Sequence, residues 1–328
     1  MYKTFLGALA LAGFVANGLA VTGAQAQTAW DMPTPYGDSN FHTQNIAKFA
    51  EDVKEATDGD LTITVHSAGS LFKHPEIKDA VRKGLVPIGE VLVSRLSNED
   101  PIFGLDSAPF VATSYDDAKK LYDAQKPELE KVLDQQGLTL LYSVPWPPQG
   151  LYTTKEVTKV EDLAGLKMRA YNAATERLAQ LAGAVPTQVE VPDLPTAFST
   201  GRVEAMVTSP STGANSKAWD YVKIYTNTQA WLPKNMVFVN KRAFQSLSEE
   251  DQKAVMEAAA AAETRGWEAS KTETEEKTQE LKDNGMTVEE PTDELMSGLK
   301  KIGETMASEW AEEAGASGKA VLDNYKSM

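Results

Sequence analysis

The chain has 328 residues, a formal net charge of −15 and no cysteine. The absence of cysteine excludes a disulfide framework, thiol chemistry and cysteine-ligated metal sites, and the negative charge argues against nucleic acid and anionic membranes as partners. An acidic protein also repels organic anions, so an anion site in this chain needs a specific local cation such as an arginine.

Residues 1–26 have the pattern of a secretory signal. Lys3 supplies the positive end, residues 5–20 are apolar or small, and Ala24-Gln25-Ala26 fits an A-x-A cleavage site. The stretch is short for a membrane-spanning helix. We therefore expect cleavage after Ala26 and export from the bacterial cytoplasm, with an uncleaved anchor as the alternative.

Strands and helices alternate along the first half of the remaining chain. The predicted strands are residues 28–35, 61–65, 87–93 and 138–144. The predicted helices are residues 41–57, 77–83 and 115–136. Pro127 is expected to interrupt the last of these helices. The strand that ends at residue 93 presents Ser94 and Arg95 at the surface of its lobe.

Similar patterns continue toward the C-terminus. The predicted strands are residues 151–154, 166–170, 187–191, 204–208 and 236–240. The predicted helices are residues 175–182, 193–200 and 249–283, with a helix or loop at residues 214–222. The helix at 249–283 contains few breakers and is too long for one small lobe.

This alternation predicts an α/β fold with two lobes. Turn-rich segments at residues 146–150 and 231–235 mark two crossings between the lobes. Because the chain crosses more than once, each lobe should combine separate parts of the sequence. We expect lobe I to comprise residues 27–147 and 237–272, and lobe II to comprise residues 148–236 and 273–328.

Arg169 is the strongest candidate for a binding residue. It lies near the end of the predicted strand 166–170, and ligands of α/β proteins usually bind at strand ends. Its planar guanidinium can hold a carboxylate through two parallel hydrogen bonds. The alternative is a surface arginine that pairs with a nearby aspartate or glutamate.

The run from Asp162 to Ala205, DLAGLKMRAYNAATERLAQLAGAVPTQVEVPDLPTAFSTGRVEA, resembles the dicarboxylate-binding type of solute-binding protein from tripartite ATP-independent periplasmic (TRAP) transporters. Those proteins carry a similar D-L-x-G-L-K-hydrophobic-R run, a Gly-x-x-Pro strand and a helix that ends L-x-T-G. The resemblance implies a periplasmic binding protein with two lobes, interlobe crossing strands and a long helix spanning both lobes. It also implies that Arg169 binds the ligand carboxylate, that no cofactor is needed, and that a membrane permease is the partner.

Two departures from the family pattern bear on the ligand. Gln149 stands about where some relatives carry a second arginine, and Thr208 replaces an asparagine found in many relatives. These changes leave one strong cationic anchor beside an amide and a hydroxyl. They favour a monocarboxylate over a dicarboxylate or a sialic acid.

Aromatic side chains gather in the same regions, at Tyr36, Phe110, Trp146 and Trp231. The two tryptophans flank both crossings beside prolines, which suggests an apolar or aromatic ligand body. The alternative is that each aromatic packs in the core or the hinge.

Three further polar residues complete the candidate site. Asn172 and Asn235 could orient ligand hydroxyls, although both would also serve as caps at strand ends without any ligand. Ser94 is the candidate from the opposite lobe.

Enzyme signatures are missing from the sequence. It contains no G-x-S-x-G, P-loop, H-E-x-x-H or G-x-G-x-x-G motif, and His42, His66 and His74 lack metal-ligand spacing and should be neutral residues at the surface or at helix ends. We therefore expect neither a catalytic nor a metal site. A secreted carboxylate-based hydrolase and a ligand-sensing partner of a receptor remain alternatives. The protein is expected to be monomeric, and its ligand could be an aromatic acid, a 2-hydroxy acid or a sugar acid.

Overall fold

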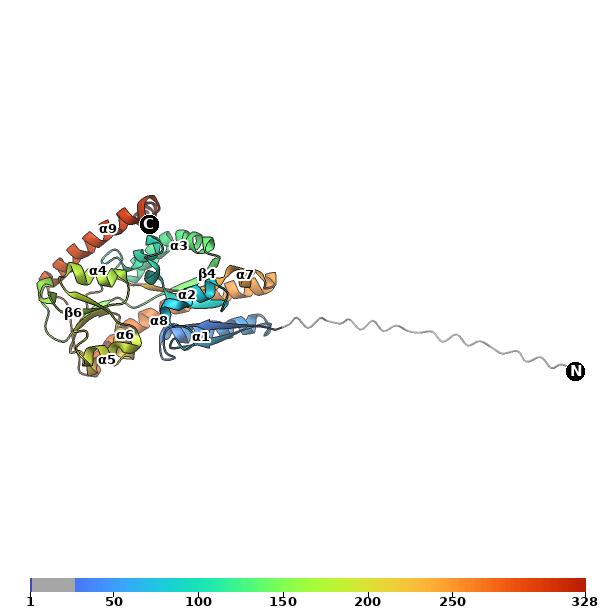
Figure 1. The fold of residues 1–328 in the computed structure, drawn as a ribbon, viewed down its shortest axis with the longest axis horizontal. Coiled ribbons are helices and arrows are strands. Elements are labelled where there is room, and N and C mark those ends of the chain that lie inside the picture. The colour runs from blue at the N-terminus through green and yellow to red at the C-terminus, as the bar shows by residue number, and fades with distance from the viewer. Residues whose placement is uncertain (2–26) are drawn as a thin grey trace.

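The computed structural model describes Met1 and residues 27–328, and it forms two α/β lobes that lie side by side (Figure 1). The predicted signal and its cleavage after Ala26 fall on residues outside this description, apart from Met1. The two-lobed α/β prediction is confirmed.

The first lobe is built on an antiparallel sheet with strand order β3-β10-β4, next to a parallel pair β1-β2. The bounds are Thr28–Pro33 for β1, Leu61–His66 for β2, Ile88–Leu92 for β3, Leu138–Pro145 for β4 and Lys234–Asn240 for β10. The helices α1 (Phe41–Ala56), α2 (His74–Arg82), α3 (Tyr115–Gln135) and α7 (Lys241–Gln245) lie around these strands.

The second lobe is built on a mixed sheet with strand order β11-β9-β5-β8-β6-β7. Its strands are β5 (Gly150–Thr153), β6 (Lys167–Ala170), β7 (Val185–Gln188), β8 (Ala205–Thr208), β9 (Ile224–Thr226) and β11 (Thr287–Glu289). Its helices are α4 (Ala173–Leu181), α5 (Leu194–Ser199) and α6 (Pro210–Asn215). The parallel trio β8-β6-β7 places the ends of β6 and β8 at the edge that faces the other lobe.

Two of the backbone segments that connect the sheets are bonded to each other. The chain leaves the first sheet after Pro145, enters the second at Gly150, and returns between β9 and β10. The amide of Trp146 donates to the carbonyl of Pro233 over 2.8 Å, and the amide of Gln149 donates to that of Trp231 over 2.9 Å. The predicted crossings therefore lie between the sheets, whereas the residue boundaries of the lobes stay a prediction.

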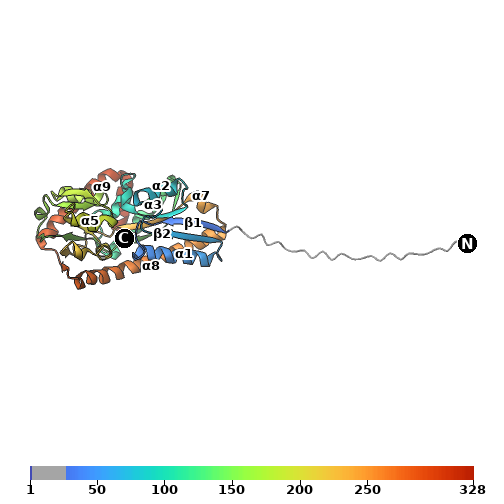
Figure 2. The same cartoon turned by 60° about the horizontal axis from the view of Figure 1, so that its bottom comes forward.

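The long helix α8 (Glu249–Asp283) contacts both lobes, as the resemblance implied (Figure 2). Its first turn is acidic, and the side chain of Ser248 accepts a hydrogen bond from the Asp251 amide, so the N-terminus is well capped. The helix packs on α1 and β4 at one end and on α6 at the other. Gly266 permits the close approach to β4, because a Cβ there would lie 2.3 Å from a methyl of Val144.

A second long helix, α9 (Asp293–Ser327), also joins two cores. Leu295 and Leu299 pack with the strands of the second lobe, while Trp310 and Val321 pack with α3 and its neighbours. Gly315 has a positive φ of 57° inside this segment, which marks a kink between its two parts.

Two predicted elements were wrong in detail, and two short strands were not predicted. Pro127 lies inside a continuous α3, because the apolar residues on both sides of it are buried in one core and outweigh the lost hydrogen bond. The strand predicted at residues 187–191 is β7, two residues earlier, and Pro186 is tolerated because β7 is an edge strand. The short strands β9 and β11 escaped prediction because three residues show no alternation.

Candidate ligand-binding site

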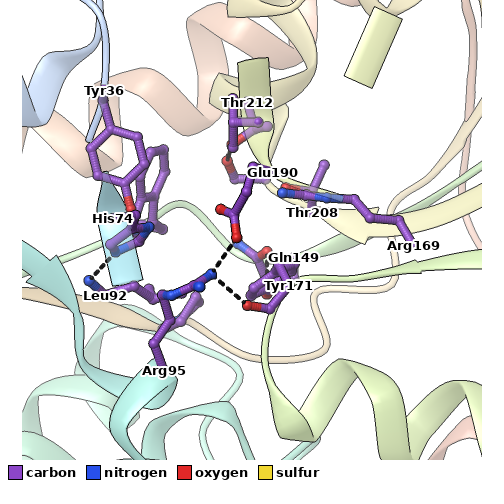
Figure 3. Close-up of a pocket in the computed structure, with 14 residues that line it drawn as sticks. Tyr36, His74, Leu92, Arg95, Gln149, Arg169, Tyr171, Glu190, Thr208 and Thr212 are labelled. Carbon is purple, nitrogen blue, oxygen red and sulfur yellow. Dashed lines mark hydrogen bonds and ion pairs between the residues drawn. The ribbon is translucent and has the colours of Figure 1, made fainter. Parts of the chain in front are cut away.

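A small cavity lies between the two lobes (Figure 3). Most of its walls come from the ends of strands and from the loops that follow them. The lining residues are Tyr36, His74, Leu92, Arg95, Trp146, Gln149, Arg169, Tyr171, Glu190, Val191, Thr208, Ser209, Thr212 and Pro233. Five of the predicted site residues are among them, namely Tyr36, Trp146, Gln149, Arg169 and Thr208.

Arg169 is a buried cation whose terminal nitrogens make no hydrogen bond to the described residues. It lies on β6, its side chain is 2% exposed, and its Nε donates to the carbonyl of Val189 over 2.9 Å. The guanidinium carbon lies 4.9 Å from the centre of the Tyr171 ring. Among residues 27–328 no carboxylate forms an ion pair with it, so it is not the surface arginine of the alternative interpretation. Burial lowers the pKa of Arg169, which shows that the protein alone compensates its charge poorly.

The residues around Arg169 are already oriented by the protein. Gln149 donates from its amide nitrogen to the carbonyl of Pro147 and accepts from the Tyr171 hydroxyl, over 2.9 and 3.2 Å. Thr208 ends β8 beside the guanidinium, and its hydroxyl makes no hydrogen bond to the described residues (Figure 3). Gln149 thus positions Tyr171, while Thr208 keeps its hydrogen-bonding capacity for a guest.

The wall contributed by the first lobe is aromatic. The rings of Tyr36 and Trp146 meet edge to face with centroids 5.0 Å apart, and the ring of His74 lies 5.8 Å from that of Tyr36. The Nε2 of His74 accepts a hydrogen bond from the Leu92 amide over 3.1 Å, so its proton resides on Nδ1. Burial and the nearby Arg95 hold the pKa of His74 well below its usual value, so this side chain is neutral.

A second arginine lines the cavity, contrary to the prediction of a single cationic anchor. One terminal nitrogen of Arg95 lies 3.0 Å from the carboxylate of Glu190 and 3.0 Å from the carbonyl oxygen of Tyr171. Both partners belong to the opposite lobe. Arg95 is therefore neutralised by Glu190, and the pair joins the lobes at the edge of the cavity (Figure 3).

The remaining predicted site residues lie outside the cavity lining. Asn172 caps α4 and donates to the hydroxyl of Ser94 over 2.8 Å, which forms another bond between the lobes. Trp231 and Phe110 line a separate apolar void inside the second lobe. Asn235 lies one layer behind the aromatic wall. The structure therefore does not bring these side chains to the cavity.

Sequence reasoning missed several lining residues for identifiable reasons. Glu190 and Val191 were assigned to a strand, whereas β7 ends at Gln188 and leaves both in the loop that faces the cavity. Tyr171 directly follows β6, and Arg95 lies in the 3-10 turn Val93–Leu96 that follows β3, so their positions at strand ends were the signal that could have identified them.

The histidines were predicted at the surface or at helix ends. His42 lies in the first turn of α1, a helix end as predicted, and it is buried in the core of the first lobe. His74 begins α2, as expected for a helix-end residue, but it also faces the cavity. His66 lies on β2 and is 2.7 Å from Asp31. Within residues 27–328 no cluster of three or more His, Asp or Glu side chains is arranged to hold a metal ion.

Two lobes joined by paired crossing segments, with an uncompensated buried arginine in the cavity between them, define a solute-binding protein for an anion. Residues 35–314 match the model of the family described as bacterial extracellular solute-binding protein, family 7, and the chain belongs to this family. The family predicted from the sequence is thereby confirmed. Its members are extracytoplasmic receptors, and none of the described helices has an apolar stretch long enough to cross a membrane.

Solved structures of three relatives have the same fold. DctP7 of Bordetella pertussis is 50% identical with a TM-score of 0.90, over 91% of this chain and 99% of that one. DctP6 of the same organism is 46% identical with a TM-score of 0.91, over 92% and 100%. A TRAP solute-binding protein from an unidentified marine microbe is 41% identical with a TM-score of 0.90, over 92% and 99%. The chain is thus a TRAP receptor for a small organic acid.

Proposed function

We propose that this protein binds pyroglutamate, or a closely similar small cyclic monocarboxylate, and delivers it to the membrane permease of a TRAP transporter. The observation that carries the proposal is the buried, unpaired guanidinium of Arg169, which needs an anion beside it. The three relatives described above are each described as binding pyroglutamate or pyroglutamic acid.

The charge of the cavity supports a monoanion. Its charged lining residues are Arg95, Arg169 and Glu190, and His74 is neutral, so two cations face one anion. The excess of one positive charge matches a ligand with one carboxylate and an otherwise neutral body. A dicarboxylate would bring an uncompensated charge into a buried site, and a zwitterion would leave Arg169 without its net counter-charge.

The remaining walls suit a compact ring. Apolar surface from Leu92, Val191 and Pro233 adjoins the edge-to-face pair of Tyr36 and Trp146. Such a wall excludes water and contacts a five-membered ring on several sides. The Thr208 hydroxyl and the Nδ1–H of His74 are free to bond the polar atoms of a lactam.

Titration calorimetry on the mature protein tests this proposal. Pyroglutamate should bind with one-to-one stoichiometry, and cyclopentanecarboxylate should bind more weakly because it lacks the lactam. Proline and glutamate should bind far more weakly, since the first is a zwitterion and the second carries an additional ammonium and an additional carboxylate that the cavity would have to desolvate. Preference for glutamate, a hydroxybenzoate, lactate or a sugar acid over pyroglutamate would contradict the proposed ligand class.

We also propose that the protein releases its ligand unaltered. Among the described residues Glu190 is the one carboxylate that lines the cavity, and it is held by Arg95, so these residues do not assemble the paired acids of a carboxylate-based hydrolase there. Recovery of intact pyroglutamate after prolonged incubation is expected, and turnover would favour the hydrolase. Export with cleavage after Ala26 and a monomeric state belong to the same proposal, and mass spectrometry of the native periplasmic protein tests both.

A further inference from the structure

We propose that Glu90 and Asn235 are positioning residues for ligand binding, which fix Trp146 and Tyr36 in the cavity wall from the layer behind them. The inference rests on the proposed function only in placing the ligand in this cavity. Neither residue lines the cavity, and their side chains are buried within the first lobe, at 1% and 2% exposure.

Both the oxygen and the nitrogen of the Asn235 side-chain amide make hydrogen bonds. Its oxygen accepts from the indole nitrogen of Trp146 over 2.9 Å and from the Tyr36 hydroxyl over 3.3 Å. An indole N–H can only donate, so the amide oxygen must face it. The amide nitrogen therefore faces the opposite way, where it donates to a carboxylate oxygen of Glu90 over 2.8 Å.

Glu90 in turn is held in place by its surroundings. It lies on β3, and its second carboxylate oxygen accepts from the hydroxyl of Thr34. The titratable groups that face it are His42 from α1, whose Nδ1 is 3.7 Å away, Tyr36 and Tyr142 from β4. No Lys or Arg among residues 27–328 forms an ion pair with it. A lone buried carboxyl is unfavourable for folding, so its use here as a fixed acceptor calls for a functional explanation.

Loss of this network would affect ligand binding through the rings of Trp146 and Tyr36. Trp146 and Tyr36 contact each other edge to face, and Tyr36 also contacts His74, so a shift of the indole would displace the whole aromatic wall. If Asn235 were absent, the indole N–H and the phenol would both lose their acceptor in a buried site. They would then reorient, and the wall would no longer match the ligand. Asn235 therefore acts on the ligand through Trp146 and Tyr36, instead of touching it as the sequence suggested.

The test uses a matched pair of variants at one position. Glu90→Gln keeps an acceptor for Asn235, whereas Glu90→Leu removes it, and Asn235→Leu removes the centre of the network. Gln125→Leu is the control, because Gln125 is an equally buried polar residue of the first lobe that bonds the carbonyl of Ile102 and does not contact the network. Pyroglutamate affinity is measured by calorimetry, and hydrogen exchange of the Trp146 indole N–H is measured by NMR on the unliganded protein, with Trp146→Phe to assign the signal.

We expect Glu90→Leu and Asn235→Leu to weaken binding by about tenfold or more and to accelerate indole exchange. Glu90→Gln should restore slow exchange and near-native affinity, and Gln125→Leu should lower stability without changing either readout. Native affinity in a folded Asn235→Leu or Glu90→Leu variant would overturn the inference. If Asn235→Leu does not fold, the Glu90 pair decides. If the native protein fails to bind pyroglutamate, the proposed ligand is wrong, while indole exchange still decides whether Asn235 holds Trp146.

Discussion

Replacement of Arg169 by alanine is the most direct test of the anion site. The substitution leaves a bound carboxylate without its charged partner in a cavity whose lining side chains are mostly buried. Truncation of one member of a buried, hydrogen-bonded charge pair costs about 2 to 5 kcal/mol. The dissociation constant for pyroglutamate should therefore rise by roughly 30- to 4,000-fold.

In the absence of ligand, the same substitution should change the stability of the protein little. Burial lowers the pKa of Arg169, and no carboxylate of the described residues compensates its charge. Loss of that charge removes a desolvation cost, which offsets the lost bond to Val189 and the lost packing. The unliganded Arg169→Ala variant should therefore melt close to the native protein, while the ligand-induced rise in melting temperature disappears.

The assay combines calorimetry with thermal melts in the presence and absence of pyroglutamate. Arg169→Lys is expected to be severely impaired as well, because an ammonium group does not reproduce two parallel hydrogen bonds. Arg82→Ala is the control, since Arg82 is an exposed arginine that pairs with Asp79 on α2. Near-native affinity in Arg169→Ala would refute the assignment of the anchor, and native affinity in Arg169→Lys would show that charge alone suffices.

Three further predictions follow from the lobes and their contacts. Glu190→Gln frees Arg95 from its ion pair and raises the positive excess of the cavity, so it should narrow the gap between the affinities for pyroglutamate and for glutarate, as measured by calorimetry with both ligands; an unchanged ratio of the two dissociation constants would argue against the charge count. Burial raises the pKa of Glu90 from its ordinary value of 4.5 to about 7, so the folded state keeps a proton that the unfolded state has lost across this range. The contribution of Glu90 to the free energy of unfolding should accordingly fall by about 3 kcal/mol as pH rises through that window, and Glu90→Gln should gain that much relative to the native protein between pH 4.5 and 7 in urea titrations; equal differences at both ends would exclude a raised pKa. Gly266→Ala places a Cβ 2.3 Å from a methyl of Val144 and should destabilise the protein by about 1 to 3 kcal/mol in the same titrations, and a neutral effect would mean that α8 can move away from β4.

Local patterns predicted the framework of the site well. The alternation of Leu166 to Ala170 placed Arg169 at a strand end, and the long run without breakers gave α8 with the bounds observed. Five of the predicted site residues line the cavity because each lies at the end of a strand or in a crossing segment, where both periodicity and turn residues are informative.

Contacts between distant parts of the chain were not predictable in this way. Arg95 and Glu190 are 95 residues apart, and nothing in either segment indicates that they meet across the lobes. Asn235 and Trp146 are 89 residues apart, so their hydrogen bond could not be read from the sequence. The sequence therefore suggested that Asn235 touches the ligand, whereas it bonds the aromatic wall on the side away from the cavity. Pro186 displaced the predicted strand and hid Glu190, since only the sheet order shows that β7 is an edge strand.

The bonded pair of crossing segments limits how the molecule can open. Because backbone amides tie residue 146 to residue 233 and residue 149 to residue 231, a torsion of one lobe about the long axis would break these bonds, whereas a bend across the pair would not. Opening should therefore proceed as a bend at this pair, in which α8 and α9 must take part because they also join the lobes. The native chain contains no cysteine, so two introduced thiols, one on each lobe, would carry spectroscopic labels whose separation reports that bend directly.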